Sequence, residues 1–348
     1  LKHFGMDIAS AVRCTTDRRP AGLRLPAGCS RHAATRQARA SRRAGPPAPP
    51  FSGCLRVISF KAMATTEEAA KYISDVVLKH RVDLVGLQGC IGKAAQSIAS
   101  VCGMQFAVDA HKTRAVLSRW PIEPIGSKLL AGHGYRVRLP SRIDVLWYNV
   151  HLREHPYAPY VLYDPLKFWV ESPIAEEFQE MLEDALAEPR APCARTSSRL
   201  GDGSPAAAEL AEMVETETQL PDLTEVLADL EAHRPTSGLT LLTGSFSAAS
   251  HLDYPAGPEW PCSRCCEAAG LTDSFDEARR HGVAECFPAS TWTSNGVQDR
   301  IDFVYYSGSC VVEWSGHLDG SNSGTADWPS DHRAVLSILR MSEGPQVV

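Results

Sequence analysis

The spacing of hydrophobic and polar residues changes repeatedly along the chain and predicts the order of its elements. Residues 55–60 (LRVISF) alternate as a half-buried strand does, whereas 67–80 (EEAAKYISDVVLKH) repeat with the 3.6-residue period of an amphipathic helix. The apolar run at 82–88 (VDLVGLQ) predicts a buried strand, and 93–101 a second helix. Short strands are then expected at 104–108, 115–118, 135–139 and 143–150.

The pattern is interrupted between residues 170 and 235, where the chain becomes acidic and alanine-rich. We expect one helix at 171–188 and another at 223–233, separated by a mobile loop around 190–205 that is rich in Pro, Ser and Gly. The acidic run is interpreted as a solvated helix face, with binding of a protein partner as the alternative.

Strand patterns return at 239–243, 300–305, 310–312 and 334–339, with short helices at 261–269 and 274–280. Strands in two groups, with helices at intervals, favour the α/β (α+β) class with two mixed sheets packed together and covered by helices. The hydrophobic fraction of 44% and the charged fraction of 22% are typical of a soluble globular protein.

The first 53 residues have a different composition, rich in Arg, Ala and Pro and without a hydrophobic period. This composition fits an organelle transit peptide, and equally a flexible tail or upstream sequence from a faulty gene model. We therefore expect a disordered segment at 1–53 and one domain at 54–340, with an acidic helical insertion at about 170–235. Residues 341–348 are expected to form a tail.

The distribution of charged residues along the chain indicates which kinds of molecule the protein can bind. Residues 1–50 hold ten of the 35 Lys and Arg but only two of the 41 Asp and Glu, so 51–348 contain 25 basic and 39 acidic residues. Affinity for nucleic acid rests largely on Lys and Arg meeting phosphates, so this acidic body argues against long nucleic acid as a partner. No apolar run reaches the roughly 20 residues that span a bilayer, and no transmembrane segment is expected.

Eleven cysteines are present, but their spacing is not that of a disulfide scaffold, which favours reduced thiols in a soluble intracellular protein. Cys262, Cys265 and Cys266 form one cluster. The first and last of these are four residues apart, as on one face of a starting helix. The alternative is half of a zinc site, for which no second CxxC or paired-His segment is found.

Polar residues gather where four of the expected strands end or begin, at 149–152 (NVHL), 243–247 (TGSFS), 299–303 (DRIDF) and 330–333 (SDHR). Each of them alone is typical of a turn. Together and in this order, they predict that the chemistry of the protein lies at the ends of its strands.

These segments and others resemble the endonuclease/exonuclease/phosphatase superfamily, in the order in which the superfamily has them. The similarity runs from residue 55 to about 339, through LRVISFK, VDLVGLQG, AVLSRWPI, NVHL, LLTGSFSAASHLDY, GLTDSF, TWTSNGVQDRIDFVYYSG and SDHRAVL. The stretch TGSFSAASHLDY is similar to a subgroup that has TGDFN at that point. The resemblance implies a four-layer αββα sandwich whose usual activity is metal-dependent hydrolysis of phosphoesters.

That mechanism uses a divalent cation, usually Mg²⁺, to neutralise the phosphoryl charge, a carboxylate to activate water, and a His held by an Asp to donate to the phosphate. By resemblance, His332 is the family His, Asp302 the Asp that holds it and Asp331 the Asp that precedes it. The retained positions expected to be catalytic are His332, Asp302, Asp331, His151 and Asn149. Arg300 of the RxD motif and Lys61 are expected to bind the substrate.

Four other family positions are replaced. Lys61 stands where the family has Asn, and Gly89 where it has the principal metal-binding Glu. Ser245 and Ser247 stand for the Asp and Asn of the GDFN segment. A glycine offers no ligand and a serine hydroxyl is a weak one, so no metal or other cofactor is expected. The loss of a base costs about 10²–10⁴ in rate and the loss of the metal several kcal/mol more, which predicts impaired hydrolysis.

Three hypotheses follow. The first is a pseudoenzyme that keeps a phosphate-sized pocket near Lys61, His151, Arg300 and His332, and binds a phosphate-bearing small ligand or a protein partner. The second is an active phosphodiesterase or phosphatase that uses Mg²⁺ or Mn²⁺ on displaced carboxylates, with the candidates Asp253, Asp299, Asp327 and Asp331. The third is a chain without a selected biochemical role.

Overall fold

The computed structural model describes residues 51–140, 143–171, 178–179, 181, 205–254, 257–285, 290–292, 299–323 and 328–342. All of them belong to one of the two units into which the chain divides, Gly45–Val348. The predictions for residues 1–50, for most of the helix at 171–188, for nearly all of the loop around 190–205 and for most of the C-terminal tail lie outside the described residues.

Seven strands form the first sheet, and its order differs from the order of the sequence because the chain crosses over repeatedly. In order across the sheet they are β10 (Ala284–Glu285), β12 (Cys310–Leu318), β13 (Ala334–Met341), β1 (Cys54–Lys61), β2 (Leu84–Gln88), β4 (Arg114–Ser118) and β3 (Gln105–Val108). β1 is parallel to β2, since helix α1 connects them, and antiparallel to β13.

Six strands form the second sheet: β5 (Ile122–Ile125), β6 (Gly132–Arg138), β7 (Asp144–His151), β8 (Leu239–Ser245), β11 (Asp302–Gly308) and β9 (Thr272–Asp273). Its central strands β7 and β8 are parallel, and β11 is antiparallel to β8. The two sheets pack face to face through alternate apolar residues such as Val57, Leu84, Trp147 and Leu241, all fully buried.

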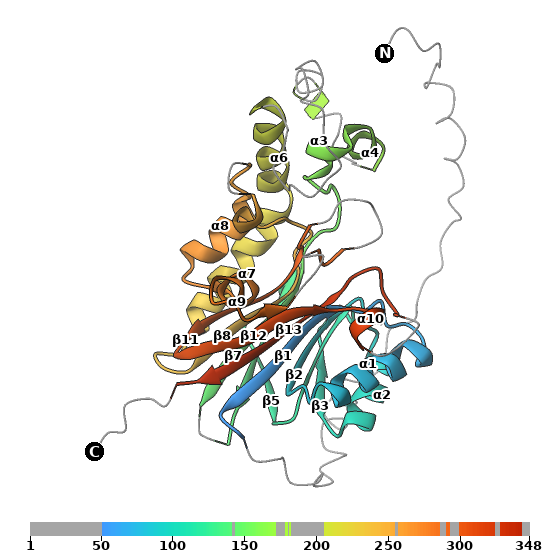
Figure 1. Cartoon of the computed structure of the whole chain (residues 1–348), viewed down its shortest axis with the longest axis vertical. Coiled ribbons are helices and arrows are strands. Elements are labelled where there is room, and N and C mark those ends of the chain that lie inside the picture. The colour runs from blue at the N-terminus through green and yellow to red at the C-terminus, as the bar shows by residue number, and fades with distance from the viewer. Residues whose placement is uncertain are drawn as a thin grey trace, which may run out of the picture. The chain divides into compact units, whose positions relative to one another are not determined.

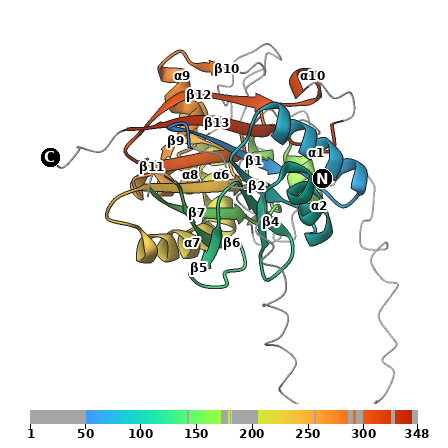
Figure 2. The ribbon, with the colours of Figure 1, turned by 90° about the horizontal axis from the view of Figure 1, so that it is seen from below.

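Helices cover both outer faces. α1 (Glu67–Lys79) begins at Thr66, whose side chain accepts a hydrogen bond from the backbone of Ala69, and packs with α2 (Gly92–Cys102) on the first sheet. α7 (Gln219–His233) and α8 (Pro261–Ala268) pack on the second sheet. Figures 1 and 2 show α1 and α2 on one side of the sheets and α7 on the other. This arrangement confirms the predicted fold class of two mixed sheets flanked by helices.

A separate apolar cluster lies beyond the ends of the strands. α3 (Tyr160–Tyr163), α4 (Pro165–Glu171) and α6 (Pro205–Glu217) contribute to it, together with the buried Tyr157 and Trp260. Three short helices complete the described elements: η4 (His251–Asp253), α9 (Ser274–Arg280) and α10 (Gly320–Ser323). Thus the C-terminal part of the predicted insertion, α7, is a covering helix of the sandwich.

Cys262 and Cys266 are buried on one face of α8 against the second sheet, as expected for a helix with this spacing. Both are free thiols, as are the other cysteines in the described part of the chain. Among the described residues, no helix is long and apolar enough to cross a membrane.

Candidate functional site

Strand directions bring the ends of six strands to one edge of the sandwich. β1 and β2, which are parallel, end at Lys61 and Gln88, and these two residues are paired in the register. In the second sheet, the register places His151, Ser245 and Asp302 side by side on three adjacent strands. β13 begins just after His332. Residues that lie far apart in the sequence therefore meet at this edge.

His332 and Asp302 form a buried hydrogen-bonded pair. The distance from His332 Nδ1 to Asp302 Oδ2 is 2.7 Å, and the two residues are 2% and 1% exposed. The opposite ring nitrogen, Nε2, lies 3.9 Å from Asp331 Oδ1. The Trp292 ring lies nearly parallel to the His332 ring, with the centroids 6.1 Å apart. The geometry fixes the imidazole through Nδ1 and turns Nε2 toward Asp331.

Lys61, Glu154 and His151 form a second group at the same edge. Glu154 Oε1 is 2.7 Å from Lys61 Nζ and 3.0 Å from His151 Nε2. The hydrogen bond with His151 is the largest cause of a strongly lowered pKa for Glu154, and Lys61 lowers this pKa further against the opposing effect of burial. Glu154 is therefore ionised at neutral pH and neutralises Lys61.

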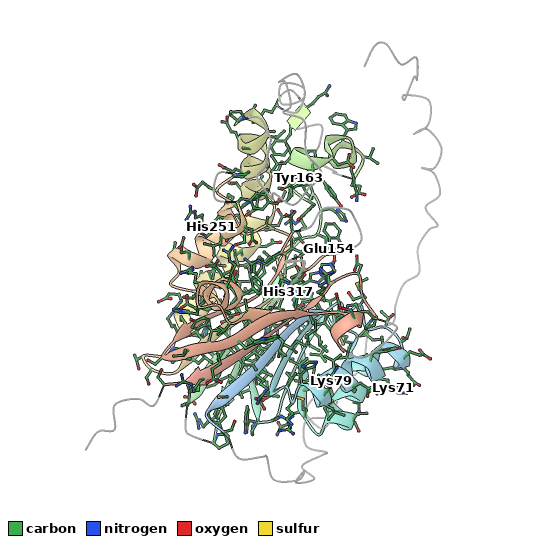
Figure 3. The ribbon with its side chains drawn as sticks, viewed as in Figure 1. Lys71, Lys79, Glu154, Tyr163, His251 and His317 are labelled. Atoms are coloured by element: carbon green, nitrogen blue, oxygen red, sulfur yellow. The ribbon has the colours of Figure 1, made fainter. Side chains whose placement is uncertain are left out.

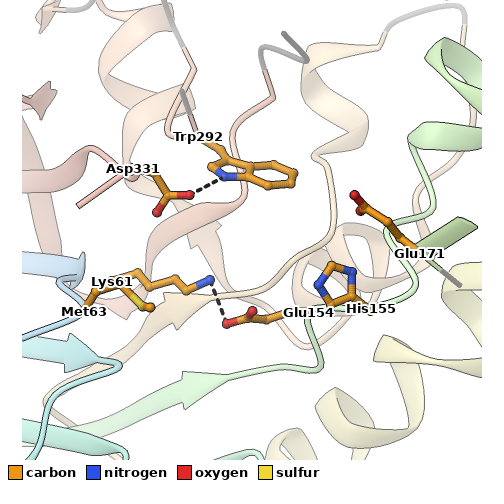
Figure 4. Close-up of a pocket in the computed structure, with 7 residues that line it drawn as sticks. All are labelled: Lys61, Met63, Glu154, His155, Glu171, Trp292 and Asp331. Carbon is orange, nitrogen blue, oxygen red and sulfur yellow. Dashed lines mark hydrogen bonds and ion pairs between the residues drawn. The ribbon is translucent and has the colours of Figure 1, made fainter. Parts of the chain in front are cut away.

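Next to this group is a cavity of about 450 Å³ (Figure 4). Its lining residues are Lys61, Met63, Glu154, His155, Glu171, Trp292 and Asp331. Trp292 Nε1 donates to Asp331 Oδ2 at 3.0 Å on one side of the cavity, and the Lys61–Glu154 ion pair lies on the other. Lys61 is the one lysine or arginine of the lining, against three carboxylates. Of the residues expected around a phosphate pocket, Lys61 alone lines this cavity, and His151, Arg300 and His332 do not.

The replaced positions have distinct surroundings. Gly89 has a φ of +66°, and a Cβ built there would lie 3.2 Å from Met63 Sδ, so the backbone itself disfavours a side chain. Ser245 Oγ and Asp302 Oδ1 are buried and have no hydrogen-bond partner among the described residues. Ser247 adopts a φ of +50°, a conformation that favours the Asn of the family pattern.

The donor set does not fit a Mg²⁺ ion at these positions. Gly89 supplies no ligand, and Ser245 supplies a neutral hydroxyl where the family has a carboxylate. No group of three or more His, Cys, Asp or Glu side chains in the described ranges could hold a metal ion.

Asn149 does not line the cavity. It is 1% exposed and lies between the two sheets, where its side-chain amide donates to the carbonyl oxygens of Leu87 and Ala115 at 3.1 and 3.2 Å. Its Oδ1 accepts from Gln88 Nε2 at 2.7 Å and from the Thr243 hydroxyl at 3.2 Å. These contacts occupy the whole amide with bonds inside the protein.

Arg300 is also enclosed. Its guanidinium is 2.8 Å from Asp253 Oδ2 and 2.7 Å from Asp273 Oδ2, and it lies over the rings of Phe275 and Phe303. With 1% of its surface exposed, Arg300 has no access to the cavity. This position gives no support to the expected role in substrate binding.

The four aspartates proposed as alternative metal ligands differ in whether other residues already hold their carboxylates. Asp253 is paired with Arg300 as described. Asp299 is buried and accepts hydrogen bonds from the hydroxyl groups of Tyr157, at 2.7 Å, and Tyr254. Asp331 lies in the cavity wall, with its side chain 45% exposed. Asp327 lies outside the described residues.

Glu154, Glu171, His155, Met63 and Trp292 line the cavity but were not predicted to do so. Trp292 falls inside the segment TWTSNGVQDRIDFVYYSG, which carries the resemblance but does not indicate which of its side chains face a cavity. The one available signal for Glu154 was its position three residues after His151.

None of the family models and none of the curated proteins compared with the sequence matches it. Among solved structures, truncated TDP2 from Caenorhabditis elegans is 13% identical, over 82% of this chain and 98% of its own, with a TM-score of 0.49. An endonuclease/exonuclease/phosphatase family protein from Bacteroides thetaiotaomicron is 14% identical over 85% and 100%, with a TM-score of 0.46. The endonuclease/exonuclease/phosphatase from Bacteroides vulgatus is 10% identical over 83% and 99%, with a TM-score of 0.49. Identities this low do not transfer an activity or a substrate to this chain.

Proposed function

We propose that the chain is a phosphoesterase-like protein with impaired catalysis, which binds a phosphate-bearing small ligand in the cavity beside Lys61 without a metal ion. The observation that carries this proposal is that the Lys61 side chain lines the cavity as its one lysine or arginine; the ligand would replace Glu154, which lies 2.7 Å from Lys61 Nζ. A covalently attached ammonium stands where the family pattern has a metal-positioning Asn. It supplies positive charge to a phosphate, but it cannot generate a nucleophilic water.

The hydrolytic parts are incomplete in the same region. His332 and Asp302 keep a hydrogen-bonded geometry suited to donating to a phosphate oxygen. Gly89 and Ser245 supply neither a metal ligand nor a base. Loss of a base lowers the rate by about 10²–10⁴. Loss of the cation raises the activation barrier by several kcal/mol more, and each increase of about 1.4 kcal/mol lowers the rate tenfold. The expected combined loss is on the order of 10⁵ or greater.

The charge of the cavity favours a particular kind of phosphate. Glu154, Glu171 and Asp331 line it together with Lys61, which is already paired. A doubly charged monoester would meet more repulsion from these carboxylates than a singly charged diester. A small phosphodiester is therefore the ligand class that this lining favours.

A second candidate function is a metal-dependent phosphodiesterase with displaced ligands, which the partly exposed carboxylate of Asp331 in the cavity wall favours. In this case Asp331 would contribute to binding Mg²⁺ or Mn²⁺, whereas Glu154 is held by Lys61 and His151. Asp253 and Asp299 are less suitable because Arg300 and two tyrosines hold them.

The test is hydrolysis of bis(p-nitrophenyl) phosphate by the full chain, with and without Mg²⁺ or Mn²⁺. A second protein carries Lys61→Asn, Gly89→Glu, Ser245→Asp and Ser247→Asn, and a third adds His332→Ala to these. We expect the native chain to be inert, the second protein to turn over with metal and the third to be inert. Thermal unfolding checks the fold of each variant, because Glu at position 89 must adopt the left-handed backbone.

Binding of dimethyl phosphate to the native chain, measured by calorimetry, completes the test. Lys61→Met should abolish the binding, and Lys71→Met on the exposed side of α1 should not change it. Metal-dependent turnover by the native chain would reject the impaired-catalysis proposal in favour of the second function.

A further inference from the structure

A second cavity, of about 830 Å³, lies on the face of the first sheet that also carries α1. Its apolar lining comes from β12 and β13 and consists of Trp314, Leu318, Leu336 and Ile338. Its polar rim includes Arg56, Lys79, His80 and Arg81, and Figure 3 labels Lys79 at the end of α1. We call this cavity the basic groove. Arg56 and Lys61 are five residues apart on β1, so the groove is roughly 16 Å from the candidate site along this strand.

Arg56 and Arg81 differ from almost all other arginines in the described part of the chain. Every other described arginine except Arg136 has a carboxylate oxygen within 3.4 Å. The guanidinium groups of Arg56 and Arg81 have no ion pair or hydrogen bond with any described residue. In a body with 39 acidic and 25 basic residues, such arginines are exceptions. Both arginines line the basic groove, where no described side chain holds their guanidinium groups directly.

The other groups of the basic groove offset only part of this charge. Its one carboxylate, Glu313, is held by Arg340 at 2.7 Å, and the nearby charge of Arg56 also lowers the pKa of Glu313 without forming an ion pair. His80 Nε2 is buried without a hydrogen-bond partner among the described residues, and burial lowers the pKa of this imidazole. Cations are favoured at a helix C-terminus, which accounts for Lys79 at the end of α1. It does not account for Arg56, which lies on β1.

We propose that the basic groove binds a nucleotide, with its base against Trp314 and its phosphates between Arg56 and Arg81. The planar guanidinium matches phosphate oxygens with two parallel hydrogen bonds. Any of the nucleobases can stack on an indole ring, because each of them has an aromatic face. An inorganic anion would not cover the apolar lining of the groove, and an uncharged aromatic ring would not pair with the two arginines. A ligand that has both an aromatic ring and a phosphate contacts the apolar lining and the arginines together. This site is independent of the function proposed above.

The test measures binding of ADP, adenosine and pyrophosphate to the full chain by calorimetry. We expect ADP to bind, and adenosine and pyrophosphate each to bind at least about tenfold more weakly, because each satisfies one half of the groove. Arg81→Gln alters an exposed residue and should weaken ADP about tenfold, as should Arg56→Gln. Trp314→Leu keeps the floor apolar and should weaken ADP but not pyrophosphate.

Two matched variants locate the site. Arg136→Gln removes the third arginine of the described ranges that has no ion pair with a carboxylate, and Lys61→Met changes the other cavity. Neither should alter ADP binding. The proposal is overturned if the native chain does not bind ADP, if pyrophosphate binds as tightly as ADP, or if Arg56→Gln and Arg81→Gln leave the affinity unchanged. Loss of ADP binding in Lys61→Met would place the nucleotide in the other cavity and also reject it.

Discussion

Lys61 and His151 hold the carboxylate of Glu154 from two sides, at 2.7 and 3.0 Å. The hydrogen bond with His151 lowers the pKa of Glu154 most, and Lys61 lowers it further. A carboxyl whose pKa is lowered on folding stabilises the fold above its ordinary pKa of 4.5 and loses that contribution as the pH falls below it. We therefore expect Lys61→Met to lose less stability than the native chain between about pH 5 and pH 3.

Urea unfolding at both pH values measures this difference. Lys71→Met, on the exposed face of α1, is the matched control and should show the native pH dependence. An identical loss of stability in Lys61→Met and native protein would mean that the ion pair contributes nothing to the pKa of Glu154.

A second prediction for a single residue concerns Arg300. Because Arg300 is buried, its substitution should affect the stability of the protein and not the binding of a ligand. Arg300→Met leaves Asp253 and Asp273 without their cation in a buried place, which is expected to destabilise the protein by about 3–5 kcal/mol. Urea unfolding measures the loss. A variant with native stability but weakened binding of dimethyl phosphate would instead restore the substrate-binding role expected from the RxD motif.

The contacts of some single residues could be predicted from the sequence, and those of others could not. The pairing of His332 with Asp302 was expected from the resemblance, and the two atoms lie 2.7 Å apart. The surroundings of Arg300 were not, since its partners Asp253 and Asp273 are 47 and 27 residues away and nothing local to the RxD motif indicates them. The contact of Glu154 with Lys61 likewise depends on how the two sheets meet.

Helix α8 depends on a group from another helix. Glu215 of α6 is fully buried, and its carboxylate accepts a hydrogen bond of 2.6 Å from the backbone N–H of Cys262 in the first turn of α8. Burial raises the pKa of Glu215 to about 7. A carboxyl whose pKa rises on folding contributes stability that is fully present below its ordinary value of 4.5 and is lost as the pH rises to about 7.

Glu215→Gln keeps the acceptor for Cys262 but removes the titration. We expect the variant to be as stable as the native chain near pH 4.5 and more stable near pH 8, by about 1–3 kcal/mol. Urea unfolding at the two pH values measures this. A variant less stable than the native chain at pH 8 would show that the charged carboxylate is the better partner for α8.

Most elements were predictable because their apolar faces repeat with a clear period. α1 was expected at 67–80 and is Glu67–Lys79, and β2 was expected at 82–88 and is Leu84–Gln88. β5, β9 and β10 were missed, the last two because two residues carry no period. The expected strand at 310–312 is β12 (Cys310–Leu318), whose bulge between Val312 and Trp314 breaks the alternation that would have extended it.

For the whole molecule, the order of motifs predicted that strand ends would meet, but not which side chains would face the cavity. Lys61 and Asp331 do so, whereas Asn149 and Arg300 point into the protein. A strand end fixes where a residue lies, and the opposing sheet decides what its side chain contacts. Asn149 is enclosed because its amide meets Gln88 and the carbonyl groups of Leu87 and Ala115 across the interface between the sheets.

The side-chain amide of Asn149 therefore connects the two sheets of the sandwich through hydrogen bonds. Asn149→Ala leaves Gln88 Nε2 without its 2.7 Å acceptor and two carbonyl groups without their donor, all inside the core. Each buried polar group left without a partner costs about 1–3 kcal/mol, so we expect a loss of about 2–4 kcal/mol in urea unfolding. Ser59→Ala removes a hydroxyl 3.5 Å from the same Gln88 nitrogen and should cost about 1 kcal/mol or less. If Asn149→Ala instead keeps native stability and loses dimethyl phosphate, Asn149 serves the site, as the resemblance implies, and the link between the sheets must lie in other residues.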